Sequence, residues 1–88
     1  MNAVNKITLR YFASVREAVG TGHETVDTTA RTASALRDEL IARGGAWAES
    51  LARGRAVRVA INQTLLQDED TALADGNEVA FFPPVTGG

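Results

Sequence analysis

The chain has 88 residues, of which 44% are hydrophobic and 23% charged, with a net charge of -2 and no cysteine. A chain of this size forms one domain that buries just over ~60% of its unfolded surface. The acidic balance, without a basic patch, argues against nucleic-acid binding, and the lack of cysteine excludes disulfides and thiolate sites. Apolar segments are too short to cross a bilayer and the first five residues do not resemble a signal peptide, so we expect a cytoplasmic protein with no membrane partner.

The first part of the chain is expected to form a strand, a short helix and a second strand. Residues 6–12 alternate between apolar and polar types, which predicts a half-buried strand. Ser14 can cap a helical turn over 15–19, for which Gly20 is the stop signal. The second strand is expected over 24–28.

The main helix is expected to begin after Thr32, a good capping residue, and to run over 33–43 until Gly44. Its core-facing stripe is Ala33, Leu36, Leu40 and Ile41, and its outward-facing residues are Arg37, Asp38, Glu39 and Arg43. A further helical turn is expected over 46–53, with Trp47 as a cover of the core.

The second half of the chain predicts three more strands. They are expected over 56–61, 64–66 and 78–82, with a polar irregular segment over 67–74. One amphipathic helix against one face of a mixed four- to five-stranded sheet accounts for every apolar stripe. The sequence therefore predicts an α+β fold of the ubiquitin-like β-grasp type over residues 1–82.

The C-terminus carries the most informative pattern. A run of strand-forming residues ends in two prolines, and the chain then closes on two glycines: Pro83, Pro84, Val85, Thr86, Gly87 and Gly88. Proline ends the strand, and glycine passes through slots too narrow for other residues. We expect residues 83–88 to form a flexible tail whose last four residues reach about 12 Å. Our hypothesis is that its carboxylate is the reacting group; the alternative is an ordinary unpacked terminus.

Two phenylalanines are expected on the sheet face that no helix covers. Because Ile7, Leu9, Tyr11, Val79 and Phe81 point to the core, alternation places Phe12 and Phe82 on the opposite face. Leu65 can join them, and Arg10, Arg16 and Arg58 can form a charged rim, as in a protein interface. The alternative places both rings under the 67–74 segment as ordinary core.

No constellation for catalysis within the domain is evident. His23 is the only histidine and is expected on the surface. The acidic run Asp68-Glu69-Asp70 lacks the glycine and the distal glutamate of an EF-hand loop, so we expect a solvated loop and no metal site. The chain is therefore expected to carry a reacting group on which other proteins act, and not to be catalytic alone.

Three blocks of the sequence resemble the MoaD family, the small sulfur-carrier subunits of molybdopterin synthase. The blocks are Phe12-Ala13-Ser14-Val15-Arg16-Glu17, Val59-Ala60-Ile61-Asn62-Gln63, and the stretch from Asp75 to the terminal Pro83-Pro84-Val85-Thr86-Gly87-Gly88. The last block is the most specific one. Asn77 departs from the aspartate that is more usual in the family, at a turn position that does not bear on the chemistry.

The resemblance implies a two-stage delivery of sulfur. An adenylyltransferase of the ubiquitin-activating type would use ATP to adenylate Gly88, and a persulfide donor would convert it to a thiocarboxylate. The tail, in which Gly87 is the narrow residue next to Gly88, would enter the large subunit of a heterotetrameric molybdopterin synthase. There it would give its sulfur to cyclic pyranopterin monophosphate. The resemblance implies that this chain itself binds no cofactor.

The resemblance also implies which residues contact partners, namely Phe12, Arg16, Leu65 and Phe82, and it leaves rival functions open. A sulfur carrier of another pathway, such as the thiamin type, is one alternative. A ubiquitin-like modifier that joins its C-terminus to lysines is another, and a plain β-grasp binding module with an idle tail is a third.

Overall fold

The computed structural model of the protein describes residues 4–84. The elements in chain order are β1 (Asn5–Tyr11), α1 (Ala13–Val19), β2 (His23–Thr28), α2 (Ala33–Ile41), α3 (Gly45–Leu51), β3 (Arg58–Ile61), β4 (Thr64–Leu65) and β5 (Glu78–Phe82). The strands form one sheet in the order β2-β1-β5-β3-β4. β1 and β5 are parallel, and the other neighbouring pairs are antiparallel.

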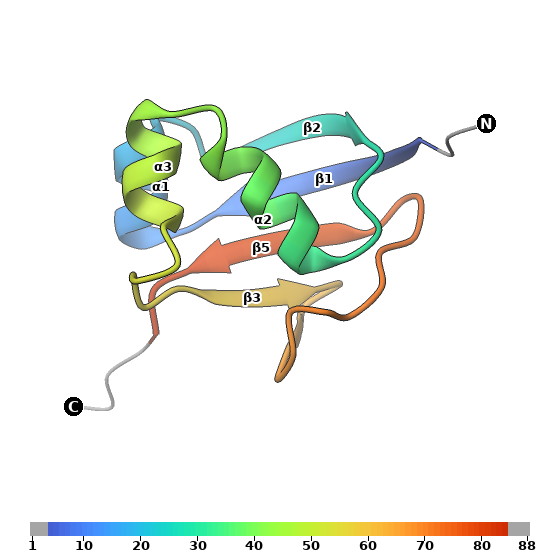
Figure 1. Ribbon diagram of the computed structural model, residues 1–88. Helices are drawn as coiled ribbons and strands as arrows, with labels where there is room; N and C mark the ends of the chain where they lie inside the picture. The colour runs from blue at the N-terminus through green and yellow to red at the C-terminus, as the bar shows by residue number, and fades with distance from the viewer. Residues whose placement is uncertain (1–3, 85–88) are drawn as a thin grey trace.

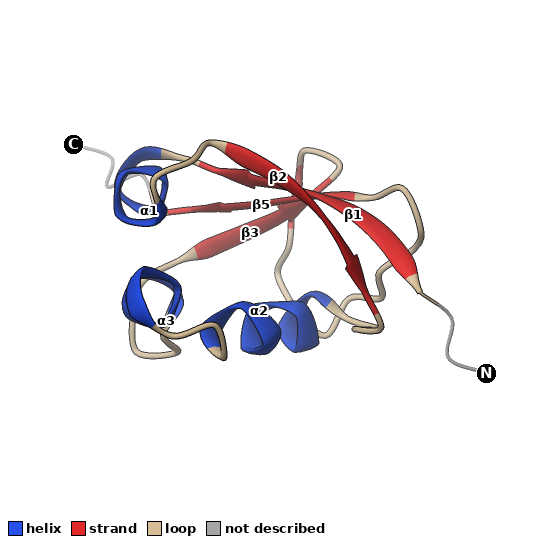
Figure 2. Cartoon of the chain, turned by 90° about the horizontal axis from the view of Figure 1, so that it is seen from above, coloured by secondary structure: helices blue, strands red, loops and turns tan. Residues whose placement is uncertain are grey.

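One face of the sheet is covered by helix and the other is open. α2 crosses in front of the sheet in Figure 1, and α3 stands beside α1 at the end of the sheet where β5 finishes. The view from above shows α2 and α3 on the same side of the sheet (Figure 2). A mixed five-stranded sheet with its main helix on one face is the β-grasp arrangement that the sequence predicts.

The core lies between the sheet and α2. Its largest fully buried side chains are Tyr11, Phe81, Ile7, Leu9, Leu36, Leu51 and Val79. Trp47 packs partly buried against this cluster, as expected of a cover, and the 67–74 segment contributes the buried Leu73. The alternation of β1 and β5 therefore predicted their core faces correctly, because successive side chains on a strand point to opposite sides.

The beginning of α1 differs from the prediction. The helix starts at Ala13, its N-cap is Phe12, and no side chain caps it, so the expected cap by Ser14 is wrong. Ala13 has a φ of 50°, and this left-handed residue turns the chain into the helix one residue ahead of Ser14. The predicted stop is confirmed: Gly20 has a φ of 83°, and its N–H donates to the carbonyl of Arg16.

The N-cap of α2 is as predicted, but one of the residues predicted to face outward from this helix is buried. Thr32 accepts a hydrogen bond from the N–H of Ala35 through its side chain, as an N-cap residue should. The helix ends at Ile41, two residues earlier than expected. Arg37 is buried and not outward-facing, because its guanidinium donates to the carbonyls of Leu51 and Ala52 at the end of α3.

Smaller differences concern strand ends. β3 begins at Arg58 and not at Ala56, and β4 stops at Leu65, so Leu66 lies outside it. The 67–74 segment runs beside the beginning of α2, where the N–H of Ala33 donates to the carbonyl of Thr71. Between residues 4 and 84, no helix combines the length and the apolar composition that crossing a membrane requires.

Candidate functional site

The open face of the sheet carries a shallow groove of about 300 Å³. Its lining comes from the strands β1, β5, β3 and β4, from the turn between the last two, and from Phe12, which follows β1 as the N-cap of α1: Arg10, Phe12, Ala60, Gln63, Leu65, Glu78, Ala80 and Phe82. The three apolar residues predicted on this face, Phe12, Leu65 and Phe82, are therefore brought together in one groove.

The groove owes its depth to two alanines in register. Arg10 pairs with Ala80, Ala80 with Ala60, and Ala60 with Leu65, so these four residues form one row across the sheet. The methyl groups of Ala60 and Ala80 are too short to fill the space between their larger neighbours. An apolar floor with larger side chains at the sides is suited to receiving an apolar side chain of another protein.

Exposure distinguishes the two interpretations of the aromatic residues. Phe12 is 43% exposed and Leu65 is 52% exposed, whereas Phe82 is half-buried. The alternative that placed both phenylalanines beneath residues 67–74 is wrong, because that segment lies against α2 on the covered side. Large apolar side chains that gather on one exposed face are a feature of docking surfaces.

The arginines predicted to rim the groove are found at three different places. Arg10 lines the groove and lies over the ring of Phe12, with its guanidinium carbon 5.8 Å from the ring centroid. Arg16 lies on α1 next to Gly22, where a Cβ atom would be 3.1 Å from Nε of the arginine. Arg58 is the register partner of Phe82, so it lies on the open face of the sheet, and it also lines a hollow with the acidic 68–70 run. Arg10 therefore lines the groove and Arg58 lies beside it on the same sheet face, whereas Arg16 does not line it.

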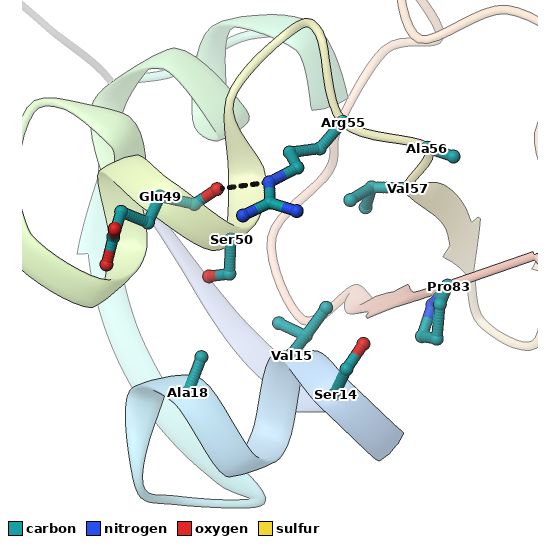
Figure 3. Close-up of a pocket in the computed structure, with 9 residues that line it drawn as sticks. All are labelled: Ser14, Val15, Ala18, Glu49, Ser50, Arg55, Ala56, Val57 and Pro83. Atoms are coloured by element: carbon teal, nitrogen blue, oxygen red, sulfur yellow. Dashed lines mark hydrogen bonds between the residues drawn. The ribbon is translucent and has the colours of Figure 1, made fainter.

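A second hollow, of about 350 Å³, adjoins the groove where β5 ends (Figure 3). Pro83 lines it together with residues of α1, α3 and the segment before β3: Ser14, Val15, Ala18, Glu49, Ser50, Arg55, Ala56 and Val57. In Figure 3 the Nε atom of Arg55 donates to the Glu49 carbonyl at 3.1 Å. Phe82 thus lines the groove, and the next residue along the chain lines the second hollow.

The residues that carry the predicted chemistry lie at or beyond the end of the described chain. Pro83 and Pro84 follow β5 and are half-buried. Val85, Thr86, Gly87 and Gly88 lie outside the described residues, so their predicted roles stay predictions. The structure does define where the tail begins, which is next to both the groove and the second hollow.

The polar cluster around Tyr11 lies on the covered side of the sheet and supports the fold. The Tyr11 hydroxyl donates to Glu24 at 2.8 Å and accepts from Nε1 of Trp47 at 3.3 Å, and Arg43 donates to both oxygens of Glu24. Burial raises the pKa of Tyr11 well above its ordinary value. Burial also acts to raise the pKa of Glu24, but hydrogen bonds from Arg43 and Tyr11 outweigh it and leave that pKa below its ordinary value.

Nothing in the described part of the chain resembles a catalytic or metal centre. His23 is exposed at the start of β2, as expected. Among residues 4–84 no three histidine or acidic side chains are placed to hold a metal ion. Sequence reasoning missed the polar end of the groove, formed by Gln63 and Glu78; strand parity could have found Glu78, which is two residues from Ala80.

Comparison with known proteins supports the resemblance seen in the sequence. Residues 9–88 match the model of the ThiS family. The molybdopterin synthase sulfur carrier subunit of Escherichia coli (strain K12) is 48% identical over 82 residues, which cover 93% of this chain and 99% of that protein.

Two solved structures share the fold over nearly the whole chain. The Haloferax volcanii HVO 2177 protein superposes with a TM-score of 0.81 at 30% identity, covering 97% of this chain and 88% of that one. A complex of subunits 1 and 2 of the molybdopterin-converting factor from Helicobacter pylori 26695 contains a chain with a TM-score of 0.64 and 26% identity, covering 94% and 99%. The resemblance to the sulfur-carrier subunits is thereby confirmed, and the chain belongs to the ThiS family.

Proposed function

We propose that this protein is the sulfur-carrier subunit of a molybdopterin synthase. The observation that carries the proposal is the 48% identity to the Escherichia coli carrier over 99% of that protein's length, together with the Gly-Gly end of this chain.

The chemistry begins with activation of the Gly88 carboxylate. A terminal carboxylate with a pKa near ~3.5 is an anion at neutral pH and a poor electrophile. Attack of its oxygen on the α-phosphorus of ATP, in the site of an activating adenylyltransferase, releases pyrophosphate and gives an acyl-adenylate. A persulfide sulfur then attacks the carbonyl carbon and displaces AMP. Cleavage of the remaining S–S bond by a thiol leaves a thiocarboxylate on Gly88.

The second stage is transfer of that sulfur in the large subunit of the synthase. The related Helicobacter pylori protein was solved in complex with its subunit 2, which supports a large-subunit partner for this chain. The groove supplies an apolar docking surface, because Phe12, Leu65 and Phe82 gather on the open face beside the place where the tail departs. The pocket and the catalytic side chains that act on the pterin belong to the partner.

Mass spectrometry of the intact protein tests the proposal. Incubation with ATP, the activating enzyme and a persulfide donor of the same organism is expected to replace one terminal oxygen with sulfur, and subsequent addition of the large subunit with its precursor is expected to yield molybdopterin. Deletion of Gly88 should abolish both products while the free energy of unfolding stays nearly unchanged. A Gly88-deleted protein that still supports molybdopterin formation would refute the assignment.

The same samples separate the rival functions. Covalent conjugates on denaturing gels would indicate a protein modifier, and sulfur transfer to a thiamin precursor but not to the pterin would indicate the other type of carrier. A wild-type protein that gains no sulfur at all would indicate a plain binding module.

A further inference from the structure

The backbone is in the left-handed region at three non-glycine residues of the described chain, and all three adjoin the groove. They are Ala13 with a φ of 50°, Asn62 with 49° and Gln63 with 70°. Ala13 follows Phe12, and Asn62 and Gln63 form the turn that joins β3 to β4. Such conformations cost of order 1–3 kcal/mol each and gather at functional sites.

The turn explains Asn62 but not Gln63. Two consecutive residues with positive φ in a two-residue hairpin loop form a type I′ turn, which prefers asparagine followed by glycine. Asn62 fits this preference, and its Oδ1 accepts a hydrogen bond from the N–H of Glu78 at 2.9 Å. Gln63 has the position where glycine is favoured.

The side chain of Gln63 does nothing for the fold that would offset this cost. It is exposed, and between residues 4 and 84 its amide makes no hydrogen bond. It does line the groove, at the same end as Glu78 and across the alanine floor from Phe12 and Phe82. A residue that strains its own turn, and whose side chain makes no hydrogen bond within residues 4–84, is best explained by a contact outside the chain.

We infer that Gln63 determines specificity for the protein that docks on the groove. Its amide hydrogen-bonds an uncharged peptide group of the partner, while an apolar side chain of that partner fills the space above Ala60 and Ala80. A neutral amide, with one acceptor and one donor group, matches a main-chain peptide group, whereas charged groups of a partner would be met by Arg10 and Glu78. The inference rests on the proposed function, which identifies this partner as the large subunit of molybdopterin synthase.

Three variants separate the amide from the backbone strain. Gln63→Gly removes both, so its urea midpoint is expected to rise while its affinity for the large subunit falls about fivefold, the equivalent of one lost hydrogen bond. Gln63→Ala removes only the amide, so the affinity falls equally without a gain in stability. Ala13→Gly is the matched control, because it relieves a left-handed residue beside the groove without removing a groove side chain, and it should bind as the wild type does.

Titration calorimetry with the large subunit of the same organism, together with urea unfolding, provides both readouts. Unchanged affinity of Gln63→Gly and Gln63→Ala, with normal binding by the wild type, would overturn the role of Gln63 alone. A Gln63→Gly protein that is not more stable would overturn the strain argument. Failure of the wild type to bind the large subunit would overturn the proposed function and this inference with it.

Discussion

Replacement of Arg37 by methionine tests how α3 is attached to the rest of the domain. The Arg37 side chain is 4% exposed, and its guanidinium donates to the Leu51 carbonyl at 2.8 Å, to the Ala52 carbonyl at 2.9 Å and to Glu69 at 2.9 Å. Leu51 is the last residue of α3, where no intrahelical donor remains for its carbonyl, whereas the carbonyl of the next residue, Ala52, also accepts from the N–H of Arg55 at 2.8 Å. Methionine fills a similar volume but satisfies none of the three acceptors.

The cost follows from which acceptors are left unpaired. A buried acceptor without a partner costs about 1–3 kcal/mol, and the Leu51 carbonyl becomes such an acceptor, whereas the Ala52 carbonyl keeps the N–H of Arg55. Glu69 loses less, because it is 29% exposed and keeps Arg53 as a partner. We therefore expect a loss of about 2 kcal/mol, which at about 4–8 °C per kcal/mol corresponds to a fall in Tm of about 8–16 °C. That is a large fraction of the total stability of a domain of this size.

Urea unfolding followed by circular dichroism measures this loss, and Arg53 offers the matched control. Arg53 also pairs with Glu69 but is 45% exposed, so Arg53→Met should cost less than about 1 kcal/mol. If Arg37→Met and Arg53→Met cost the same, the buried Leu51 carbonyl at the end of α3 does not depend on Arg37 and the reasoning is refuted.

Three further predictions concern the polar cluster and the groove. Glu24→Gln should lower the free energy of unfolding at neutral pH. A carboxylate whose pKa is depressed in the folded state stabilises the protein above its unfolded pKa, and this contribution is lost as the pH falls through the folded pKa, so the difference from the wild type should then vanish. Urea unfolding of both proteins at neutral pH and at a pH below the folded pKa of Glu24 measures this. The single tyrosine, Tyr11, should give its tyrosinate absorbance only well above the ordinary pKa, and a normal titration would contradict its burial against Glu24. Phe82→Asp should weaken binding of the large subunit at least tenfold, whereas Val4→Asp, an exposed apolar residue outside the groove, should not.

The sheet could be predicted from the sequence, since the two-residue period of a strand decides at once which side chains are buried. That period also placed Phe12 and Phe82 on the open face, where the structure has them. Helix faces were less predictable. Arg37 is a charged residue that periodicity assigns to solvent, and only the tertiary placement of α3 gives its guanidinium acceptors. No sequence pattern states where α3 will lie.

The start of α1 and the position of Arg16 show a related limit. The hydroxyl of Ser14 could cap a helix, but the helix begins one residue earlier, at the left-handed Ala13. Ser14 therefore lies inside the helix and is not its N-cap residue. Arg16 lies on α1, as predicted, next to Gly22, and it is not among the residues that line the groove. Backbone conformations that a residue type seldom adopts cannot be read from propensity, so the first residue of the helix and its cap were predicted at the wrong positions.

The place of β5 in the sheet explains how docking and reaction can be separated in this domain. β5 is the last strand along the chain but the middle strand of the sheet, held by β1 on one side and by β3 on the other. Phe82 is therefore fixed in the groove, and the chain departs at Pro83 from a defined point. Under the proposed function, affinity then resides in side chains of the sheet, and reactivity in the carboxylate of Gly88, six residues after Phe82. Changes in the groove should alter how tightly a partner binds without altering the chemistry of the bound complex, whereas loss of Gly88 should do the reverse.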